Sequence, residues 1–411
     1  MFGVDYMLMN RGDNFSWLRD NDELELITTE VMHSECGNPT QNLMKSPCDV
    51  NSLANYDILQ IVGKGGFSIV YIVRCKRTAK IYAMKSINEK VIRKWSKYDN
   101  MENEKHILMM VHHPFIISLA QNIECENYIN WVIDFWPGGD LFYWISKNTR
   151  LSEEVARFYI CEIIIALEYL HSLNILYRDL KPTNVLIDAE GHIKLTDFGL
   201  SLPFFTEESV SSTFCGTPEY MSPEMLLQLG HNRWVDFYSL GVTLYEMLVG
   251  VPPFYNSDRK VMYTSILKDE IKFYRHMSKD AKDLIDSLMT KDPRERLGAN
   301  YGFFEIKQHP FFSKVNWKKF ESGTVKPPLM PPIRETNFSD EFTSIHLDLE
   351  FVQDKVISEN VSEDDTAHEK KLDFGTSHST KIDDNRKEVE EEFYDWYNDL
   401  STRNLPNYWE V

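Results

Sequence analysis

The sequence predicts an α+β protein in which a small, sheet-rich lobe precedes a larger, mainly helical lobe. Between residues 56 and 135, short apolar runs separated by turn residues have the texture of strands, with one helix among them. After Gly138 and Gly139, apolar residues recur mainly at helical spacing. Hydrophobic residues make up 43% of the 411 residues and charged residues 26%, which is ordinary for a globular protein with a sizeable core.

Each lobe can be divided into expected elements. Residues 56–74 contain an apolar run, a glycine cluster and a second apolar run, which predicts two strands joined by a tight turn. Tyr82–Ile87 predicts a third strand, Lys97–Met110 a helix, and residues 128–135 alternate like a further strand. The larger lobe is expected to contain helices at Leu141–Ser146, Val155–Ser172, Tyr238–Val249, Ser278–Met289 and Phe303–His309.

The two ends of the chain differ from its middle in charge. The net charge of −19 arises from nine acids against three bases in residues 1–49 and twenty against seven in residues 340–411. A neutral middle with acidic ends argues against nucleic acid and anionic membranes as partners. We expect a mobile extension over residues 1–55, and a proline-rich linker followed by a disordered acidic stretch at about 354–392. The prolines of that linker are Pro327, Pro328, Pro331 and Pro332.

Cysteines and apolar segments exclude further classes. The six cysteines, at positions 36, 48, 75, 125, 161 and 215, form no CxxC pair or Cys/His cluster, so buried free thiols are expected. The most apolar helix, Phe158–Leu170, carries two glutamates and is too short to span a bilayer. No basic start is followed by a long apolar run, which favours cytosol or nucleus and no integral membrane association.

A glycine-rich turn lies between the first two expected strands, with the sequence Gly63-Lys64-Gly65-Gly66-Phe67-Ser68-Ile69-Val70. Small residues there would let backbone N–H groups approach phosphate oxygens closely. An ordinary hairpin turn would look similar, so this motif by itself leaves both readings open. A P-loop NTPase is excluded here because no Gly-Lys-Ser/Thr closes the loop.

A single lysine interrupts the third expected strand. In Tyr82-Ala83-Met84-Lys85, the charge of Lys85 is costly on an apolar strand unless it is paired. Glu104, on the following helix, is the expected partner, and the pair would position Lys85 on the α- and β-phosphates of a nucleotide. Spacing alone also allows Glu104 to face solvent.

The most specific signal is Tyr177-Arg178-Asp179-Leu180-Lys181-Pro182-Thr183-Asn184, followed thirteen residues later by Asp197-Phe198-Gly199. This spacing matches what phosphoryl transfer requires. Asp179 would accept the proton of the attacking hydroxyl, and Lys181 would neutralise charge on the moving phosphoryl group. Asn184 and Asp197 would hold Mg²⁺.

With these motifs the chain resembles a eukaryotic protein kinase of the AGC group, the relatives of cyclic-nucleotide-dependent kinases, protein kinase C and ribosomal S6 kinases. The resemblance covers about residues 56–342. It implies a bilobal kinase domain at 56–312, with lobes at 56–134 and 135–312, followed by an AGC-type tail at 313–411. Its other markers are Tyr177 in place of the usual His, residues 191–196, 213–220, 291–298 and 309–312, and the tail motif 337–342.

The resemblance also implies roles for individual residues. Ile133 would be the gatekeeper and Asp134–Trp136 the hinge, Asp140 would reach the ribose, and Phe338 would pack over the nucleotide. Glu224 should pair with Arg296, and Asp236 should brace the catalytic loop. The full expected nucleotide-binding set is Gly63, Lys64, Gly65, Gly66, Phe67, Ser68, Val70, Ala83, Lys85, Glu104, Ile133, Asp134, Trp136, Asp140 and Phe338.

Regulation is where this chain departs from the family pattern. Thr213 is the expected activation-loop phosphosite, the target of an upstream kinase. Between Lys194 and Arg233, however, there is no Lys or Arg to help Arg178 bind the phosphate, and Leu202 stands where a relative carries Lys. Thr213→Ala should therefore reduce the activity by less than about a thousandfold. In the tail, the aromatic segment Phe393–Tyr397 either docks on the small lobe or is merely a sticky terminus.

Substrate choice departs from the pattern as well. Asp140, Thr217 and Glu246 are expected at the peptide site, where acidic groups would bind basic residues upstream of the target. Thr183 replaces a glutamate that would select Arg at the second upstream position. We therefore expect Arg at the third upstream position, weaker selection at the second, and Ser as the favoured acceptor. A pseudokinase, a scaffold acting through its acidic ends, and a small-molecule kinase are the alternatives.

Overall fold

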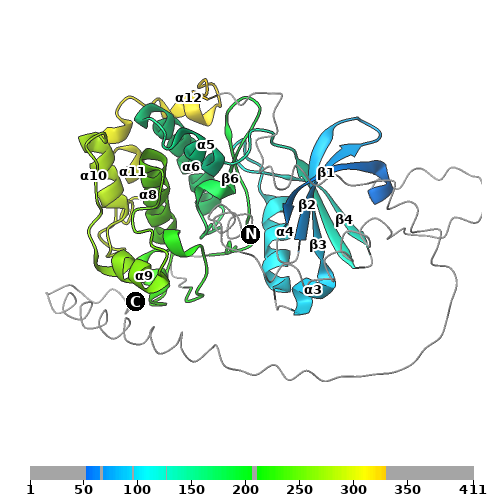
Figure 1. The fold of residues 1–411 in the computed structure, drawn as a ribbon, viewed down its shortest axis with the longest axis horizontal. Helices are drawn as coiled ribbons and strands as arrows, with labels where there is room; N and C mark the ends of the chain where they lie inside the picture. The colour runs from blue at the N-terminus through cyan, green and yellow to red at the C-terminus, as the bar shows by residue number, and fades with distance from the viewer. Residues whose placement is uncertain (1–51, 65–67, 95–96, 126, 206–210, 330–411) are drawn as a thin grey trace, which may run out of the picture.

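The computed structural model describes residues 52–64, 68–94, 97–125, 127–205 and 211–329. It consists of two lobes, a five-stranded sheet with two helices and a larger helical lobe (Figure 1). The predicted α+β architecture is therefore confirmed. The expectations for residues 1–51, for Phe338 and Phe393–Tyr397 in the tail, and for Cys36 and Cys48 lie outside the described residues. The last residues of the expected mobile extension are ordered, because Leu53–Asn55 form a 3-10 turn capped by Ser52.

The small lobe is built on an antiparallel sheet of order β1-β2-β3-β5-β4. Its strands are β1 Tyr56–Lys64, β2 Ser68–Cys75, β3 Ile81–Asn88, β4 Leu119–Cys125 and β5 Tyr128–Asp134. The predicted strands are present, but the sequence analysis missed β4. This edge strand buries little besides Ile123, so its polar residues concealed it.

Strand β5, which the sequence predicted at residues 128–135, is covered on both faces. Ile129, Trp131 and Ile133 join the core shared with the larger lobe, whereas Tyr128 and Val132 join a second core under β1–β3. Even Asn130 is buried, and its Nδ2 donates to the Ile123 carbonyl. A central strand between two cores is apolar on both sides.

Two helices follow β3. Helix α3 (Glu89–Lys94) was missed, and α4 (Tyr98–Met110) was predicted to within one residue. Helix α4 lies on the side of the sheet that faces the larger lobe (Figure 1), and its Met101, Ile107 and Leu108 join the shared core. The same helix carries buried Glu104 toward the site.

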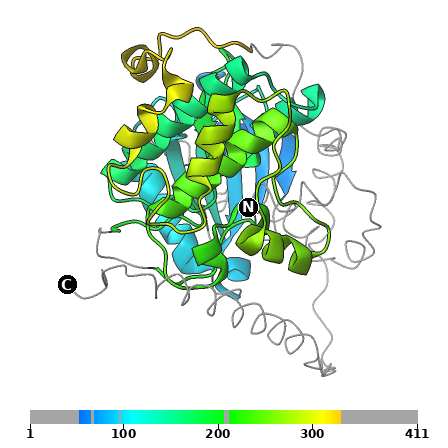
Figure 2. The same ribbon diagram turned by 90° about the vertical axis from the view of Figure 1, so that its left-hand side faces the viewer.

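The larger lobe is organised around two buried helices, α6 (Glu153–Ser172) and α8 (Trp234–Val249). Every residue of α8 from Val235 to Leu248 is buried, including Asp236 and Glu246, so this helix is the centre of the lobe. Figure 2 shows these helices in front of the sheet. The surrounding helices are α5 Leu141–Asn148, α9 Arg259–Lys268, α10 Lys279–Leu288, α11 Phe303–Lys307 and α12 Trp317–Glu321.

Helix boundaries follow local capping and burial. The N-terminus of α6 is capped by Ser152, and that of α5 by Asp140, whose Oδ1 accepts the N–H of Tyr143 at 2.7 Å. Helix α8 begins four residues before its predicted start, and its first turn, which includes Val235, Asp236 and Phe237, is buried together with the rest of the helix. Helix α9 was missed because it buries only three of its side chains.

Short elements connect the lobes to the site. The hairpin β6 (Val185–Ile187) and β7 (Ile193–Leu195), the 3-10 turns at Pro182–Asn184 and Pro218–Tyr220, and helix α7 (Pro223–Leu226) were not predicted. Within the part of the chain that the structure describes, no helix is long and apolar enough to cross a membrane. Of the four cysteines that the structure describes, none of which is in a disulfide, Cys75 and Cys161 are buried as expected, whereas Cys125 and Cys215 are half-buried.

Candidate active site

Asp179 lies at the centre of a buried hydrogen-bond network. Its Oδ2 accepts from Lys181 Nζ at 2.9 Å and Asn184 Nδ2 at 3.0 Å. Its Oδ1 accepts from the hydroxyl of Thr217 at 2.8 Å and from the N–H of Thr217 at 3.1 Å. Lys181 also donates to that hydroxyl at 2.6 Å. The fold thus joins the three predicted catalytic residues to Thr217, a predicted substrate-binding residue 38 positions away.

The loop that carries Asp179 is held by α8. Asp236, fully buried, accepts the N–H of Arg178 at 2.8 Å through Oδ1 and the N–H of Tyr177 at 3.0 Å through Oδ2. Its Oδ2 also lies 2.7 Å from Nε2 of His171, a contact the sequence analysis missed. The expected brace is confirmed. It stabilises a loop in which Arg178 has a φ of 66°, a strained backbone that persists only with such support.

Tyr177, which served only as a family marker in the sequence, has a structural task. Its hydroxyl donates to the carbonyl of Thr196, and its ring packs edge-on against Phe198 with centroids 5.5 Å apart. These contacts flank Asp197, whose φ of 59° places it in the left-handed region. Tyr177 therefore holds the turn that presents Asp197.

The two predicted metal ligands fit a divalent cation. Oδ1 of Asn184 is buried and has no hydrogen-bond partner among the described residues, although Nδ2 of the same side chain is bound. A buried oxygen without a donor suits a cation. No three His, Cys, Asp or Glu side chains converge on a metal-sized position within the described residues. A cation held by Asn184 and Asp197 would therefore need oxygens from phosphate or water, as Mg²⁺ commonly does.

The expected pair of Lys85 and Glu104 forms across the lobe. Nζ of Lys85 lies 2.7 Å from Oε1 of Glu104, both side chains are about one-tenth exposed, and the ammonium stands 5.2 Å above the ring of Trp131. A Cβ at Gly199 would lie 3.4 Å from both Oε2 of Glu104 and Oδ1 of Asp197. The two carboxylates therefore border the same glycine, and the ion pair adjoins the turn at Asp197.

The residues that were predicted to surround the adenine form an apolar surface. Val70, Ala83 and Ile133 are buried in one core, and Ala83 is the register partner of Ile133. Gly138 is required where the chain crosses β6, since a Cβ there would lie 2.5 Å from the carbonyl of Ile187. Ser68, at the start of β2, is also buried. Gly65, Gly66, Phe67 and the side chain of Lys64 lie outside the described residues.

Three further residues that were predicted to bind the nucleotide contact other groups of the protein. Asp134 bonds Lys80 at 2.6 Å, and Lys194 lies 4.5 Å above the ring of Trp136. Asp140 caps α5, where desolvation raises the pKa of its carboxyl, while the N–H of Tyr143 opposes that shift. The structure keeps Asp140 half-buried at the edge of the site and leaves its predicted ribose contact untested.

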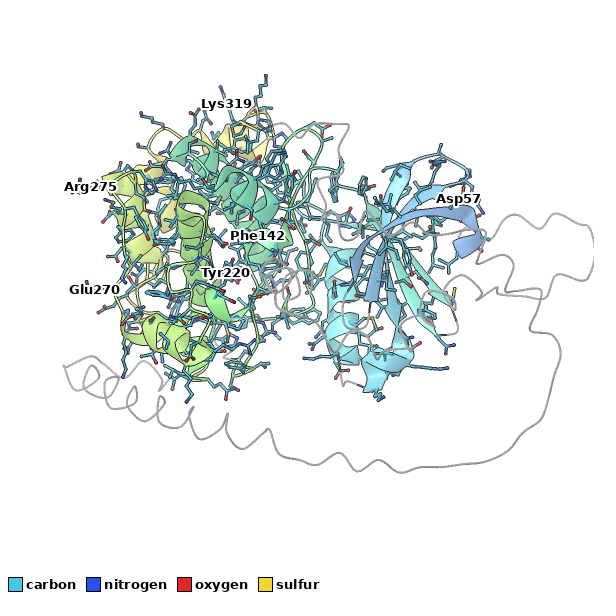
Figure 3. The ribbon with its side chains drawn as sticks, in the orientation of Figure 1. Asp57, Phe142, Tyr220, Glu270, Arg275 and Lys319 are labelled. Atoms are coloured by element: carbon cyan, nitrogen blue, oxygen red, sulfur yellow. The ribbon has the colours of Figure 1, made fainter. Side chains whose placement is uncertain are left out.

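Glu246 is buried rather than open to a peptide. Its Oε2 accepts the hydroxyl hydrogen bond of Tyr220, and its Oε1 has no partner among the described residues. Figure 3 shows Tyr220 inside the larger lobe. Burial raises the pKa of Glu246 to about 8. The hydrogen bond from Tyr220 acts in the opposite direction but is the smaller effect. Thr183 is also buried, with its hydroxyl unpartnered within the described part of the chain. Neither side chain offers an exposed charge to a peptide.

We expect Glu246→Gln to stabilise the protein at pH 7 by roughly 3 kcal/mol. The native state keeps a proton that the unfolded chain loses near pH 4.5, so the free energy of unfolding should fall as pH rises from there to about 8. The variant should flatten this slope in urea unfolding curves measured from pH 5 to 8. Glu295→Gln, at an exposed position, is the control, and equal slopes in all three proteins would contradict the prediction.

Residues 56–312, more than half of the chain, match the family model of the protein kinase domain. Protein kinase 3 of Dictyostelium discoideum is 43% identical over 69% of this chain and 32% of its own length. The serine/threonine-protein kinase YPK1 of Saccharomyces cerevisiae is 42% identical over 75% of this chain and 46% of its own length. Human serine/threonine-protein kinase Sgk1 is 40% identical over 74% of this chain and 70% of its own length.

The chain belongs to the protein kinase family. Within that family it belongs to the AGC group of serine/threonine kinases, as the resemblance predicted. The matched region spans less than two thirds of the first two of these relatives.

Proposed function

We propose that this protein transfers the γ-phosphoryl group of ATP to serine or threonine hydroxyls of protein substrates. The observation that carries the proposal is the network of Asp179, Lys181, Asn184 and Thr217, which joins an acceptor carboxylate, a cation and a metal-binding amide within hydrogen-bond distance. A pseudokinase would have no need to keep this combination buried and fully connected.

Each residue has a task in the proposed reaction. Asp179 orients the substrate hydroxyl and accepts its proton, while Lys181 neutralises charge on the transferred group. Lys85, oriented by Glu104, binds the α- and β-phosphates. The apolar surface of Val70, Ala83 and Ile133 takes the adenine.

Asn184 and Asp197 would hold Mg²⁺, and the unpartnered Oδ1 of Asn184 supports this assignment. When bound, the metal would neutralise negative charge on the phosphates. Tyr177 and Asp236 position these groups through Thr196 and the backbone of the catalytic loop.

For substrates, we propose proteins with an arginine three residues upstream of the target serine. Half-buried Asp140 is the acidic group that supports this preference. Burial of Glu246 and Thr183 supports weak selection at the second upstream position. An upstream kinase is a further candidate partner.

The test is phosphate incorporation from Mg-ATP into an arginine-directed peptide library containing Ser, Thr or Tyr acceptors. The wild-type protein should label Ser and Thr peptides, and the label should require Mg²⁺ and vanish in Asp179→Asn. Equal labelling by both proteins would refute the proposed activity. A strong preference for Arg at the second upstream position would refute the substrate assignment.

Glu104→Gln is expected to lower kcat/KM by about one to two orders of magnitude, because a misplaced Lys85 no longer aligns the phosphates. Glu102→Gln is a matched control on the same helix, since Glu102 is 43% exposed and lies 3.9 Å from Lys105. Steady-state kinetics with varied ATP would show the difference. If both variants kept wild-type kcat/KM, the role given to the ion pair would be wrong.

A further inference from the structure

The hairpin of β6 and β7 carries both predicted metal ligands at its open end. Asn184 directly precedes β6, and Asp197 lies two residues beyond the end of β7. Val185 and Leu195 are register partners at that end. The N–H of Thr196 donates to the carbonyl of Asn184 at 3.0 Å. Because the two ligands extend from paired strands, their relative position depends on how firmly the hairpin is held.

The carboxylate of Glu162, on α6, holds the opposite end of this hairpin. Each strand has three residues, and such a short two-stranded ribbon needs support from neighbouring groups. Oε2 of Glu162 accepts the N–H of Ile193 at 3.0 Å, and Oε1 lies 2.6 Å from Nδ1 of His192. Within the turn, Oδ1 of Asp188 accepts the N–H of His192 at 2.8 Å. Glu162 therefore connects the start of β7 to one of the two helices around which the larger lobe is organised.

Glu162 is a buried carboxylate that takes no part in the proposed reaction. Its exposed fraction is 1%, and such a group is costly unless it is paired and hydrogen-bonded. His192 is the partner, and its ring lies with its centroid 6.0 Å from those of Phe115 and Phe158. Burial raises the pKa of Glu162, an effect that His192 and the N–H of Ile193 oppose. The hydrogen bond to Glu162 raises the pKa of His192, which favours the charged imidazolium.

Other titratable groups also face this pair. In addition to that hydrogen bond, the charges of Asp188 and Glu190 in the turn raise the pKa of His192. Burial raises the pKa of Tyr159 on α6 and lowers the pKa of Lys194 on β7. An experiment that varies pH must therefore separate His192 from Lys194.

We propose that Glu162, acting through His192, is a positioning residue that holds the β6–β7 hairpin in place for the binding of Mg²⁺. With the hairpin held, Asn184 and Asp197 keep the relative position that a shared cation requires. Loss of the carboxylate would leave Lys85 and the adenine surface in place, so the defect should appear only when Mg²⁺ is present. This role deepens the proposed function and rests on it.

The test compares the binding of ADP to the full chain in Mg²⁺ and in EDTA by isothermal titration calorimetry. Glu162→Gln should weaken binding about tenfold in Mg²⁺ and leave it nearly unchanged in EDTA, because groups that orient metal ligands act on the metal affinity. Glu168→Gln, at a 40% exposed position on the same helix, is the matched control and should change neither value. An equal loss in Mg²⁺ and in EDTA, or no loss at all, would overturn the proposal.

The pH dependence of this binding tests the charge of His192. Because its pKa is raised from 6.5, the imidazolium persists above pH 6.5 and is lost as pH rises through the raised pKa. From pH 6.5 to 9, the gain in ADP affinity that Mg²⁺ gives should therefore fall severalfold in the wild-type protein relative to His192→Gln. Lys194 is present in both proteins, so its titration and that of the nucleotide cancel. The same pH dependence in both proteins would overturn the part given to His192.

His192→Gln also keeps the proposal testable if Glu162→Gln does not fold. At pH 6.5 it should weaken ADP binding in Mg²⁺ and not in EDTA, and equal losses would overturn the proposal. Failure of the proposed function is distinguishable from failure of this role. A wild-type protein that transfers no phosphate but shows the Mg²⁺-specific loss in Glu162→Gln would refute the activity and support the positioning role.

Discussion

Asp179→Asn is expected to reduce kcat about a thousandfold or more, with KM for ATP changed by only a few fold. An amide cannot accept the proton of the attacking hydroxyl. It also offers one acceptor oxygen where Asp179 uses two, so contact with either Lys181 or Thr217 would be lost. Single-turnover and steady-state kinetics with a serine peptide would measure the effect, and a kcat within tenfold of wild type would contradict it.

Asp188→Asn is the matched control for this substitution. Asp188 is a second buried aspartate nine residues away, and its Oδ1 accepts the N–H groups of Glu190 and His192 at 3.0 and 2.8 Å. An asparagine oxygen can accept the same bonds, so activity should stay within a few fold of wild type. Thermal unfolding of both variants would separate a lost proton acceptor from a damaged fold.

Arg296→Met is expected to cost about 3–5 kcal/mol of stability and to lower Tm by about 10 °C. Arg296 is fully buried in its side chain and donates to both oxygens of Glu224, at 2.7 and 3.0 Å. The resemblance predicted this pair, and the structure confirms it. Removing the guanidinium would leave the carboxylate of Glu224 buried without its partner, which is costlier than losing the pair itself.

Arg294→Met is the control, because Arg294 pairs with Asp292 at 2.7 Å but is 31% exposed. That change should cost no more than about 1 kcal/mol. Adding Glu224→Gln to Arg296→Met should recover part of the loss, since it removes the unpaired charge. Urea unfolding would measure all four proteins, and equal losses for the Arg294 and Arg296 variants would contradict the argument.

Local patterns in the sequence were sufficient for much of the architecture. The third strand, predicted at Tyr82–Ile87 and observed at Ile81–Asn88, and helix α6 were predicted because each contains a run rich in apolar residues. The elements that were missed, β4, α3, α7, α9, α12 and the β6–β7 hairpin, are short or bury few of their residues. In these segments the pattern of apolar residues is too short or too weak to distinguish a helix or strand from a loop.

For the active site, too, the sequence predicted some features and only the structure decided others. Asp179, Lys181 and Asn184 lie within six residues, so the sequence by itself indicated the chemistry of this segment. The pairing of Lys85 with Glu104 was expected, but the structure decided it against a solvent-facing Glu104. Only the tertiary structure decided that Thr217 joins Asp179 and that His171 contacts the carboxylate of Asp236. Those contacts join residues 38 and 65 positions apart. The geometry of these contacts depends on the packing of the buried helix α8, and that packing cannot be inferred from the spacing of residues in the sequence.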